Sequence, residues 1–249
     1  MVTVSVWIPA RLASERLPRK MLADIDGEPL IVRVWRQAEA AEVGPVYVAA
    51  ADTEIVDIIT RAGGRAILTD PALPSGSDRV CAASEGLGAD LAGDWLINLQ
   101  GDMPYFPAAY LRRLAGALDA SVSDAVTLCA PLTDERSRGD PAVVKAAAIF
   151  TDASDPAEVP VPYFSRAPVP WTGDAADLPL WGHIGVYAWR RESLRRFVEL
   201  PPSPLETRER LEQLRALEAG MSISALLVDT MPDAIDTAED LERARGLTR

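Results

Sequence analysis

A largely apolar run at residues 2–8 leads directly into a loop that carries four cations between residues 11 and 20. The run is typical of a buried strand, and the cations are Arg11, Arg16, Arg19 and Lys20. Open α/β sheets bind ligands outside the carboxyl ends of their strands, where this loop would lie. Guanidinium and ammonium groups gathered there suit a polyphosphate, which offers several acceptor oxygens. The alternative interpretation is a solvated loop with scattered charges.

The elements that follow alternate between strand and helix. Helices are predicted at 28–41 and 53–62, the second capped by Asp52 or Thr53, and short strands at 46–50 and 66–68. This order predicts an α/β fold with a parallel sheet and right-handed crossovers. Later strands are predicted at 95–99, 125–130, 143–148, 181–189 and 223–228, with helices at 107–120, 204–219 and from Thr237 onward. Residues 133–141 are predicted to form a loop, and 152–162 a surface excursion.

Two more loops carry residues suited to a ligand. The loop at 70–79 leads into a helix, and Ser75, Gly76 and Arg79 would supply free backbone N–H groups and a cation to an anion or a nucleotide edge. An ordinary helix cap is the alternative there. The strand at 95–99 delivers Gln100 and Asp102 to the edge that holds the basic loop, where the carboxylate could ligate Mg²⁺. A purely structural aspartate is the alternative.

Composition excludes several classes of function. A formal net charge of −12 argues against general nucleic-acid binding, which needs a basic face. The chain has no signal-peptide pattern and no apolar run of about 20 residues, so we expect a cytoplasmic protein without a membrane partner. Cys81 and Cys129 are expected to be reduced core residues. A single histidine, His183, excludes a zinc-type cluster.

The second half of the chain offers weaker patterns. In the strand at 181–189, positions 183, 185 and 187 point one way, so His183 and Tyr187 could face a common cavity; a structural histidine is the alternative. Glu206, Glu209 and Gln213 fall on one face of the predicted helix at 204–219, most simply a solvated face. Near the end, Asp236 precedes a helix capped by Thr237, with Asp240 at the capping-box position.

Taken together, stretches spread over nearly the whole chain resemble the 3-deoxy-manno-octulosonate (Kdo) cytidylyltransferases, or CMP-Kdo synthetases. They are IPARLASERLPRKML at 8–22, PSGSDR at 74–79, LQGDMP at 99–104, PYFSRAPVPW at 162–171, HIGVY at 183–187, SPLETRERLEQLRALEAG at 203–220 and IDTAEDLER at 235–243. The resemblance implies a Rossmann-like nucleotidyltransferase fold, with a mostly parallel sheet, helices on both faces and a smaller dimerisation lobe. The expected organisation is one nucleotidyltransferase domain over 1–249, with an acceptor and dimerisation lobe from about 131–200, working as a homodimer.

The same resemblance implies a reaction and its residues. CTP and Kdo would react with Mg²⁺ to give the CMP-sugar and pyrophosphate, a step of lipopolysaccharide biosynthesis. Catalytic roles fall to Arg11, Lys20, Asp102 and Asp236, of which the two aspartates match the family's metal ligands. Nucleotide-binding positions are Pro9, Ala10, Arg11, Ser14, Arg16, Lys20, Ser75, Gly76, Arg79, Gln100 and Asp102, and acceptor-binding positions are Gln100, Arg166, His183, Tyr187, Glu212 and Gln213. No residue is identified as a required general base, because a metal-lowered hydroxyl pKa could suffice.

Three departures from the family pattern leave the acceptor open. Leu73, Met103 and Ala142 stand where the family usually has His, Glu and Asn. One hypothesis is CMP transfer to Kdo, and a second is the same transfer to another acid, such as a modified octulosonate or a small phosphonate. A third is a nucleotide-binding regulator without turnover, which the retained carboxylates and cations disfavour.

Overall fold

The computed structural model describes residues 2–14, 16–150, 157–171 and 179–246. The chain divides into two compact units, one of Met1–Gly116 with Pro232–Arg249 and one of Ala117–Met231. Each unit is described by itself below. Glu15 of the basic loop, and residues 152–156 of the predicted surface excursion, lie outside the described residues.

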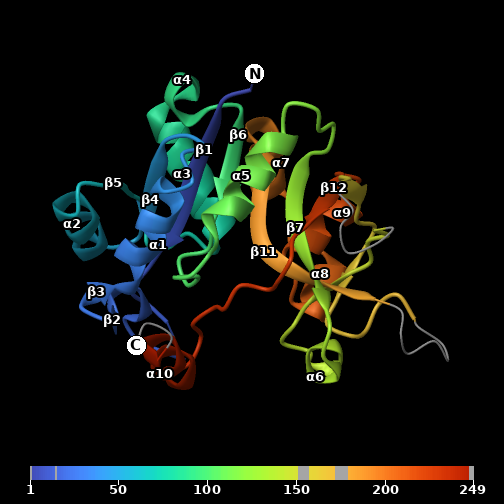
Figure 1. The fold of residues 1–249 in the computed structure, drawn as a ribbon. Helices are drawn as coiled ribbons and strands as arrows, with labels where there is room; N and C mark the ends of the chain where they lie inside the picture. The colour runs from blue at the N-terminus through green and yellow to red at the C-terminus, as the bar shows by residue number, and fades with distance from the viewer. Residues whose placement is uncertain (1, 15, 151–156, 172–178, 247–249) are drawn as a thin grey trace. The chain divides into compact units, whose positions relative to one another are not determined.

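The first unit is built on four parallel strands in the order β5-β4-β1-β6 (Figure 1). They are β1 (Val4–Ala10), β4 (Val46–Ala50), β5 (Arg65–Leu68) and β6 (Trp95–Asn98). The predicted strands therefore form, with β1 shifted two residues toward the basic loop. Both β1 and β4 are buried on both faces, and Trp7 of β1 stacks on Tyr47 of β4 with ring centroids 4.7 Å apart. Such burial explains why these strands are nearly continuous apolar runs.

Helices connect these strands in two directions. From β1 the chain passes through α1 (Leu30–Glu39) to β4, and through α2 (Thr53–Arg61) to β5. It then returns through α3 (Gly76–Leu87) to β6 on the other side of β1, and α3 packs against β1, β4 and β6. Right-handed crossovers therefore place α1 and α2 on one face and α3 on the other. The reversal makes the carboxyl ends of β1 and β6 the switch point, where such sheets bind ligands.

Smaller elements complete this unit. They are the 3₁₀ turn η1 (Lys20–Leu22), the hairpin of β2 (Asp24–Ile25) and β3 (Glu28–Pro29), α4 (Ala89–Ala92), α5 (Ala108–Ala117) and α10 (Ala238–Gly246). The hairpin replaces the first residues of the helix predicted at 28–41, because Pro29 adopts an extended conformation and the helix begins only at Leu30. The predicted capping box of α10 is confirmed: the Asp240 N–H donates to the Thr237 hydroxyl, and the Thr237 N–H donates to the Asp240 carboxylate.

The second unit is a mixed sheet around β7 (Ala125–Leu132). That strand pairs antiparallel with β11 (Leu180–Arg190) and parallel with β12 (Ile223–Leu227). Short strands extend the sheet, with β8 (Lys145–Ala146) on β11, β9 (Val159–Pro160) on β12, and β10 (Phe164–Ser165) on β8. Its helices are α6 (Glu135–Gly139), α7 (Arg191–Glu199), α8 (Pro204–Glu209) and α9 (Gln213–Glu218).

The helix predicted at 204–219 is two helices. A capping box between Ser203 and Glu206 starts α8, and the left-handed conformation of Arg210 (φ 55°) ends it. The solvated-face interpretation of the polar stripe is also wrong. Glu206 forms an ion pair with Arg215 at 2.6 Å, with both side chains largely buried. Glu209 accepts hydrogen bonds from the second unit's β10 region, and Gln213 is buried.

Other differences are local. The predicted loop at 133–141 contains the one-turn α6, because Asp134 accepts a hydrogen bond from the Ser137 N–H as an N-cap. Only Lys145–Ala146 of the strand predicted at 143–148 pairs in the sheet. The two cysteines are buried and form no disulfide, as predicted. No helix within the described ranges is long and apolar enough to cross a membrane.

Candidate nucleotide site in the first unit

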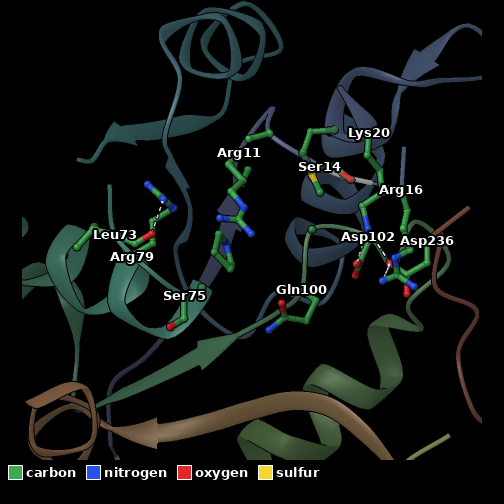
Figure 2. A pocket seen from close by; sticks show the side chains of 16 residues that line it. Arg11, Ser14, Arg16, Lys20, Leu73, Ser75, Arg79, Gln100, Asp102 and Asp236 are labelled. Atoms are coloured by element: carbon green, nitrogen blue, oxygen red, sulfur yellow. Dashed lines mark hydrogen bonds and ion pairs between the residues drawn. The ribbon is translucent and has the colours of Figure 1, made fainter. Parts of the chain in front are cut away.

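A pocket of about 800 Å³ opens at the carboxyl ends of β1 and β6 (Figure 2). Every residue predicted to bind nucleotide or metal lines it: Pro9, Ala10, Arg11, Ser14, Arg16, Lys20, Ser75, Gly76, Arg79, Gln100, Asp102 and Asp236. Four segments separated in sequence contribute, namely the loop after β1, the start of α3, the turn after β6 and the loop before α10. Ala13, Met21, Leu73 and Gly101 also line the pocket without a predicted binding role.

The basic loop folds back on itself above β1. The Arg19 N–H donates to the Leu12 carbonyl at 3.1 Å, and the Leu12 N–H donates to the Asp52 carboxylate at 2.8 Å. Arg19 does not line the pocket, because its guanidinium pairs with Glu54 at 2.5 Å. Three of the four cations counted in the sequence therefore face the pocket: Arg11, Arg16 and Lys20.

Asp52 is a positioning residue that the sequence analysis missed. We predicted it as a possible cap of the helix at 53–62, but it makes no side-chain capping hydrogen bond to α2. Its carboxylate instead anchors the start of the basic loop at Leu12. The available signal was its position two residues after the end of β4, since the carboxyl ends of neighbouring parallel strands share one edge.

The most buried charge in the pocket is the ammonium of Lys20. Its Nζ lies 2.9 Å from Asp102 Oδ2 and 3.1 Å from Asp236 Oδ1, and the lysine side chain is only 9% exposed. Arg16 also pairs with Asp236 Oδ1, at 3.1 Å. Two carboxylates that lie far apart in the sequence therefore share one cation, and Figure 2 shows them converging on it.

Backbone contacts hold the two carboxylates together. The Ile235 N–H donates to the Asp102 carbonyl at 2.9 Å, which ties the loop before α10 to the turn after β6. The Asp236 N–H donates to Asp240 at 3.0 Å, within the capping box of α10. At Gly101 an added Cβ would lie 3.0 Å from both the Pro9 carbonyl oxygen and the Met21 sulfur, so glycine permits this close approach.

The opposite wall is the start of α3. Ser75 is the N-cap, and its hydroxyl oxygen accepts a hydrogen bond from the Asp78 N–H. The buried guanidinium of Arg79 donates to Thr69 Oγ1 at 2.5 Å, to the Asp70 carbonyl at 3.0 Å and to the Leu73 carbonyl at 3.4 Å. Burial, and then the neighbouring positive charge of Arg11, lowers the pKa of Arg79. Two cations near one another favour an anion between them.

The donor set fits a magnesium ion. In the part of the chain that the structure describes, no group of three or more His, Cys, Asp or Glu side chains is suited to a metal. Mg²⁺, however, is usually held by one or two carboxylates together with substrate phosphates and water. Asp102 and Asp236 would supply those carboxylates if the ion binds here, and both already bind a positive charge, the Lys20 ammonium.

The predicted acceptor residues fall in both units. Gln100 lines the first unit's pocket, whereas Arg166, His183, Tyr187, Glu212 and Gln213 belong to the second unit. The His183 and Tyr187 rings lie together, with centroids 5.3 Å apart, as the strand alternation predicted. Burial lowers the pKa of His183 to about 3.

The other acceptor candidates differ in their contacts. Arg166 donates through all three guanidinium nitrogens to the Glu209, Pro141 and Arg210 carbonyls. The Tyr187 hydroxyl and the Gln213 side-chain amide nitrogen are buried and have no hydrogen-bond partner among the described residues. These two groups are therefore available to a polar ligand.

The three departures from the family pattern lie in different surroundings. Leu73 lines the nucleotide pocket, and Met103 is buried one residue after Asp102. Ala142 is exposed in a turn, where its N–H donates to the Asp140 carboxylate at 2.8 Å. Only Leu73 is thus placed to touch a ligand of the first unit's pocket.

Comparisons with known proteins agree with this geometry. Residues 6–223 match the family described as Cytidylyltransferase. Relatives named 3-deoxy-manno-octulosonate cytidylyltransferase include one from Parvibaculum lavamentivorans, 52% identical over 97% of this chain and 91% of the relative. Another, from Rhodospirillum centenum, is 51% identical over 97% of this chain and 92% of the relative.

Solved structures carry the same fold. One described as CMP:2-keto-3-deoxy-manno-octonic acid synthetase complexed with CTP superposes with a TM-score of 0.88, at 34% identity over 99% of this chain and 98% of that one. A glucose-1-phosphate thymidylyltransferase from Bacillus anthracis, at 15% identity and a TM-score of 0.65 over 99% and 96% of the two chains, shares the fold alone. The predicted α/β fold with a mostly parallel sheet is confirmed. The chain belongs to the family of 3-deoxy-manno-octulosonate cytidylyltransferases and is a nucleotidyltransferase.

Proposed function

We propose that this enzyme transfers CMP from CTP to the hydroxyl of Kdo and releases pyrophosphate. The observation that carries the proposal is the pocket at the β1–β6 switch point, where Arg11, Arg16 and Lys20 meet Asp102 and Asp236. The family supports the chemistry, since its relatives are named for this transfer and the similar synthetase was solved with CTP.

In this proposal the basic loop holds the triphosphate. Arg11, Arg16 and Lys20 neutralise the phosphate oxygens and steady the departing pyrophosphate, with Pro9, Ala10 and Ser14 forming the floor and side of the pocket. Ser75, Gly76 and Arg79 hold the cytidine end, and Gln100 is the residue of this pocket that we assign to acceptor binding as well as to nucleotide binding. Arg79 acts by positioning, because its contacts fix the 69–73 segment that borders the pocket.

Asp102 and Asp236 would hold Mg²⁺ against the nucleotide. When bound there, the metal would neutralise phosphate charge and lower the pKa of the attacking hydroxyl. Lys20 now binds both carboxylates, so it would turn toward the phosphates when a metal takes its place. Magnesium is our assignment from these ligands.

In this reaction the protein forms no covalent bond to either substrate. The acceptor hydroxyl oxygen forms a bond to the α-phosphorus, the bond from that phosphorus to the bridging oxygen breaks, and pyrophosphate leaves with the electron pair. The hydroxyl proton passes to solvent. Positioning and charge neutralisation therefore carry the rate, as in other phosphoryl transfers.

The acceptor side completes the proposal. Within the second unit, the residues proposed to bind the sugar acid are Arg166, His183, Tyr187, Glu212 and Gln213, and a lobe of about 131–200 would carry the acceptor and dimer contacts. We propose a cytoplasmic homodimer that acts in lipopolysaccharide biosynthesis. The unpartnered Tyr187 hydroxyl and Gln213 amide nitrogen support a polar ligand in this unit.

Pyrophosphate release tests the proposal. The purified protein would be assayed with CTP and Mg²⁺, first with Kdo and then with a panel of modified octulosonates and small phosphonates. Fast release with Kdo is expected, with UTP, ATP and GTP as nucleotide controls. Release only with another acid would mean that the acceptor assignment is wrong while CMP transfer stands. CTP binding without release for any acid would favour a regulator.

A further inference from the structure

The hydroxyl of Thr127 is surrounded by three polar atoms in the second unit. It lies 2.7 Å from the Val186 carbonyl oxygen, 3.1 Å from the Ile184 carbonyl oxygen and 3.1 Å from His183 Nε2. A bulge in β11 creates this arrangement, since the pairing with β7 shifts register between Ile184 and Tyr187. Bulges of this kind re-aim side chains and carbonyls near functional sites.

Counting donors assigns the proton positions. A carbonyl oxygen can only accept a hydrogen bond, and a threonine hydroxyl has one hydrogen. That hydrogen must point to the carbonyls, because an oxygen–oxygen contact of 2.7 Å without a hydrogen is repulsive. The Thr127 oxygen then faces His183 with lone pairs alone, so Nε2 must carry the ring proton.

The other ring nitrogen is therefore an acceptor. Among the described residues, His183 Nδ1 has no hydrogen-bond partner, although the residue is only 9% exposed, with Phe164 at 4.7 Å and Tyr187 at 5.3 Å between ring centroids. A neutral imidazole with a proton on Nε2 keeps a lone pair on Nδ1. Burial also keeps the ring neutral, since it lowers the pKa to about 3.

We propose that Thr127 is a positioning residue that holds His183 in the Nε2–H tautomer, so that Nδ1 accepts a hydrogen bond from a hydroxyl of the sugar acid. His183 then selects an acceptor that offers a hydroxyl donor, and it does not pair as a cation with the carboxylate. The inference rests on the proposed function, because it is the acceptor that supplies the donor.

The chain has one histidine, so a single ring reports on the proposal. Protein labelled with ¹⁵N-histidine would be examined by two-dimensional ¹H–¹⁵N NMR at neutral pH, with and without Kdo. We expect a protonated Nε2, an unprotonated Nδ1, and a change of the Nδ1 shift toward a hydrogen-bonded acceptor when Kdo is added. A proton on Nδ1, or an imidazolium, in the free protein would overturn the assignment.

Variants separate positioning from packing. Thr127→Val keeps the shape of the side chain and removes the hydroxyl, so we expect a mixture of tautomers and a KM for Kdo raised about tenfold, the effect of one hydrogen bond, with the KM for CTP unchanged. Thr127→Ser should restore both the tautomer and the KM. An unchanged KM in a folded Thr127→Val variant would refute the positioning role.

The same samples distinguish this inference from the function on which it rests. If the protein turns over Kdo but the Nδ1 chemical shift does not change when Kdo is added, the inference alone is refuted. Absence of turnover with Kdo would refute the proposed acceptor, and the spectrum of the free wild-type protein would still decide the tautomer. That wild-type spectrum needs no variant to fold.

Discussion

Replacing Lys20 with methionine removes the one ammonium that two carboxylates share while keeping most of the side-chain volume. The lysine is 9% exposed, but Asp102 and Asp236 are 25% and 40% exposed, and Arg16 still neutralises Asp236. Breaking a fully buried pair costs about 3–5 kcal/mol and an exposed pair about 0–1 kcal/mol. Because the exposure of this cluster is intermediate, we expect the free energy of unfolding to fall by about 2 kcal/mol. For a chain of this size that loss corresponds to a fall in Tm of about 4–8 °C.

Thermal unfolding with and without MgCl₂, in the absence of CTP, is the assay. Mg²⁺ should restore much of the Tm of the Lys20→Met variant, because the unpaired carboxylates then bind the ion, and it should leave the wild type nearly unchanged. Arg19→Met is the matched control, since it removes a cation of the same loop whose partner is Glu54 outside the pocket. The reasoning is refuted if Lys20→Met is as stable as the control, or if Mg²⁺ stabilises the wild type equally.

Three further substitutions test the packing and charges around the units. Gly101→Ala should destabilise the protein by about 1–3 kcal/mol in denaturant titrations, because its methyl would lie 3.0 Å from a backbone oxygen; Gly86→Ala, with open space around it, should not. Arg79→Met should raise the CTP Kd measured by calorimetry about tenfold through loosening of the pocket wall, and an unchanged Kd would exclude that role. Burial alone would raise the pKa of Glu206, but hydrogen bonds led by Arg215 lower it below its usual value. The stabilisation that the Glu206–Arg215 pair provides is therefore complete above the unfolded pKa of about 4.3 and is lost as the pH falls through the lower folded value. Arg215→Met removes this pair, so the free energy of unfolding should fall less steeply as the pH is lowered through this range.

The nucleotide pocket could be predicted from the sequence because its residues follow the ends of parallel strands. Arg11 and Lys20 follow β1, and Asp102 follows β6, so one sheet edge gathers them whatever the details of the loops. Asp236 lies far along the chain and was assigned by resemblance alone. The structure accounts for its place through the hydrogen bond between Ile235 and Asp102.

Features set by single backbone conformations could not be predicted. The left-handed residue Arg210 splits a segment whose periodicity favours one long helix, and nothing in that periodicity marks it. Likewise, the direction of Arg19 depends on its own left-handed conformation and on Glu54 across the loop. The polar stripe was misinterpreted because the charge partner of Glu206, Arg215, lies beyond the break in the helix.

The surroundings of His183 could be predicted from the sequence only in part. Strand alternation correctly brought His183 and Tyr187 together, but the bulge in β11 sets which carbonyls face Thr127. The bulge places Gly185 and Val186 between two consecutive pairs with β7, and the glycine was the available sequence signal, which strand alternation does not use. The tautomer of the histidine follows from that geometry alone.

The central claim is most directly tested by identifying the product formed from CTP and Kdo. Wild-type protein with Mg²⁺ should release one pyrophosphate for each CMP–Kdo conjugate detected by mass spectrometry, and Asp102→Asn should lower this rate at least about a hundredfold. Failure of the wild type to form the conjugate would contradict the assigned transfer. A full rate in Asp102→Asn would contradict the pocket as its site.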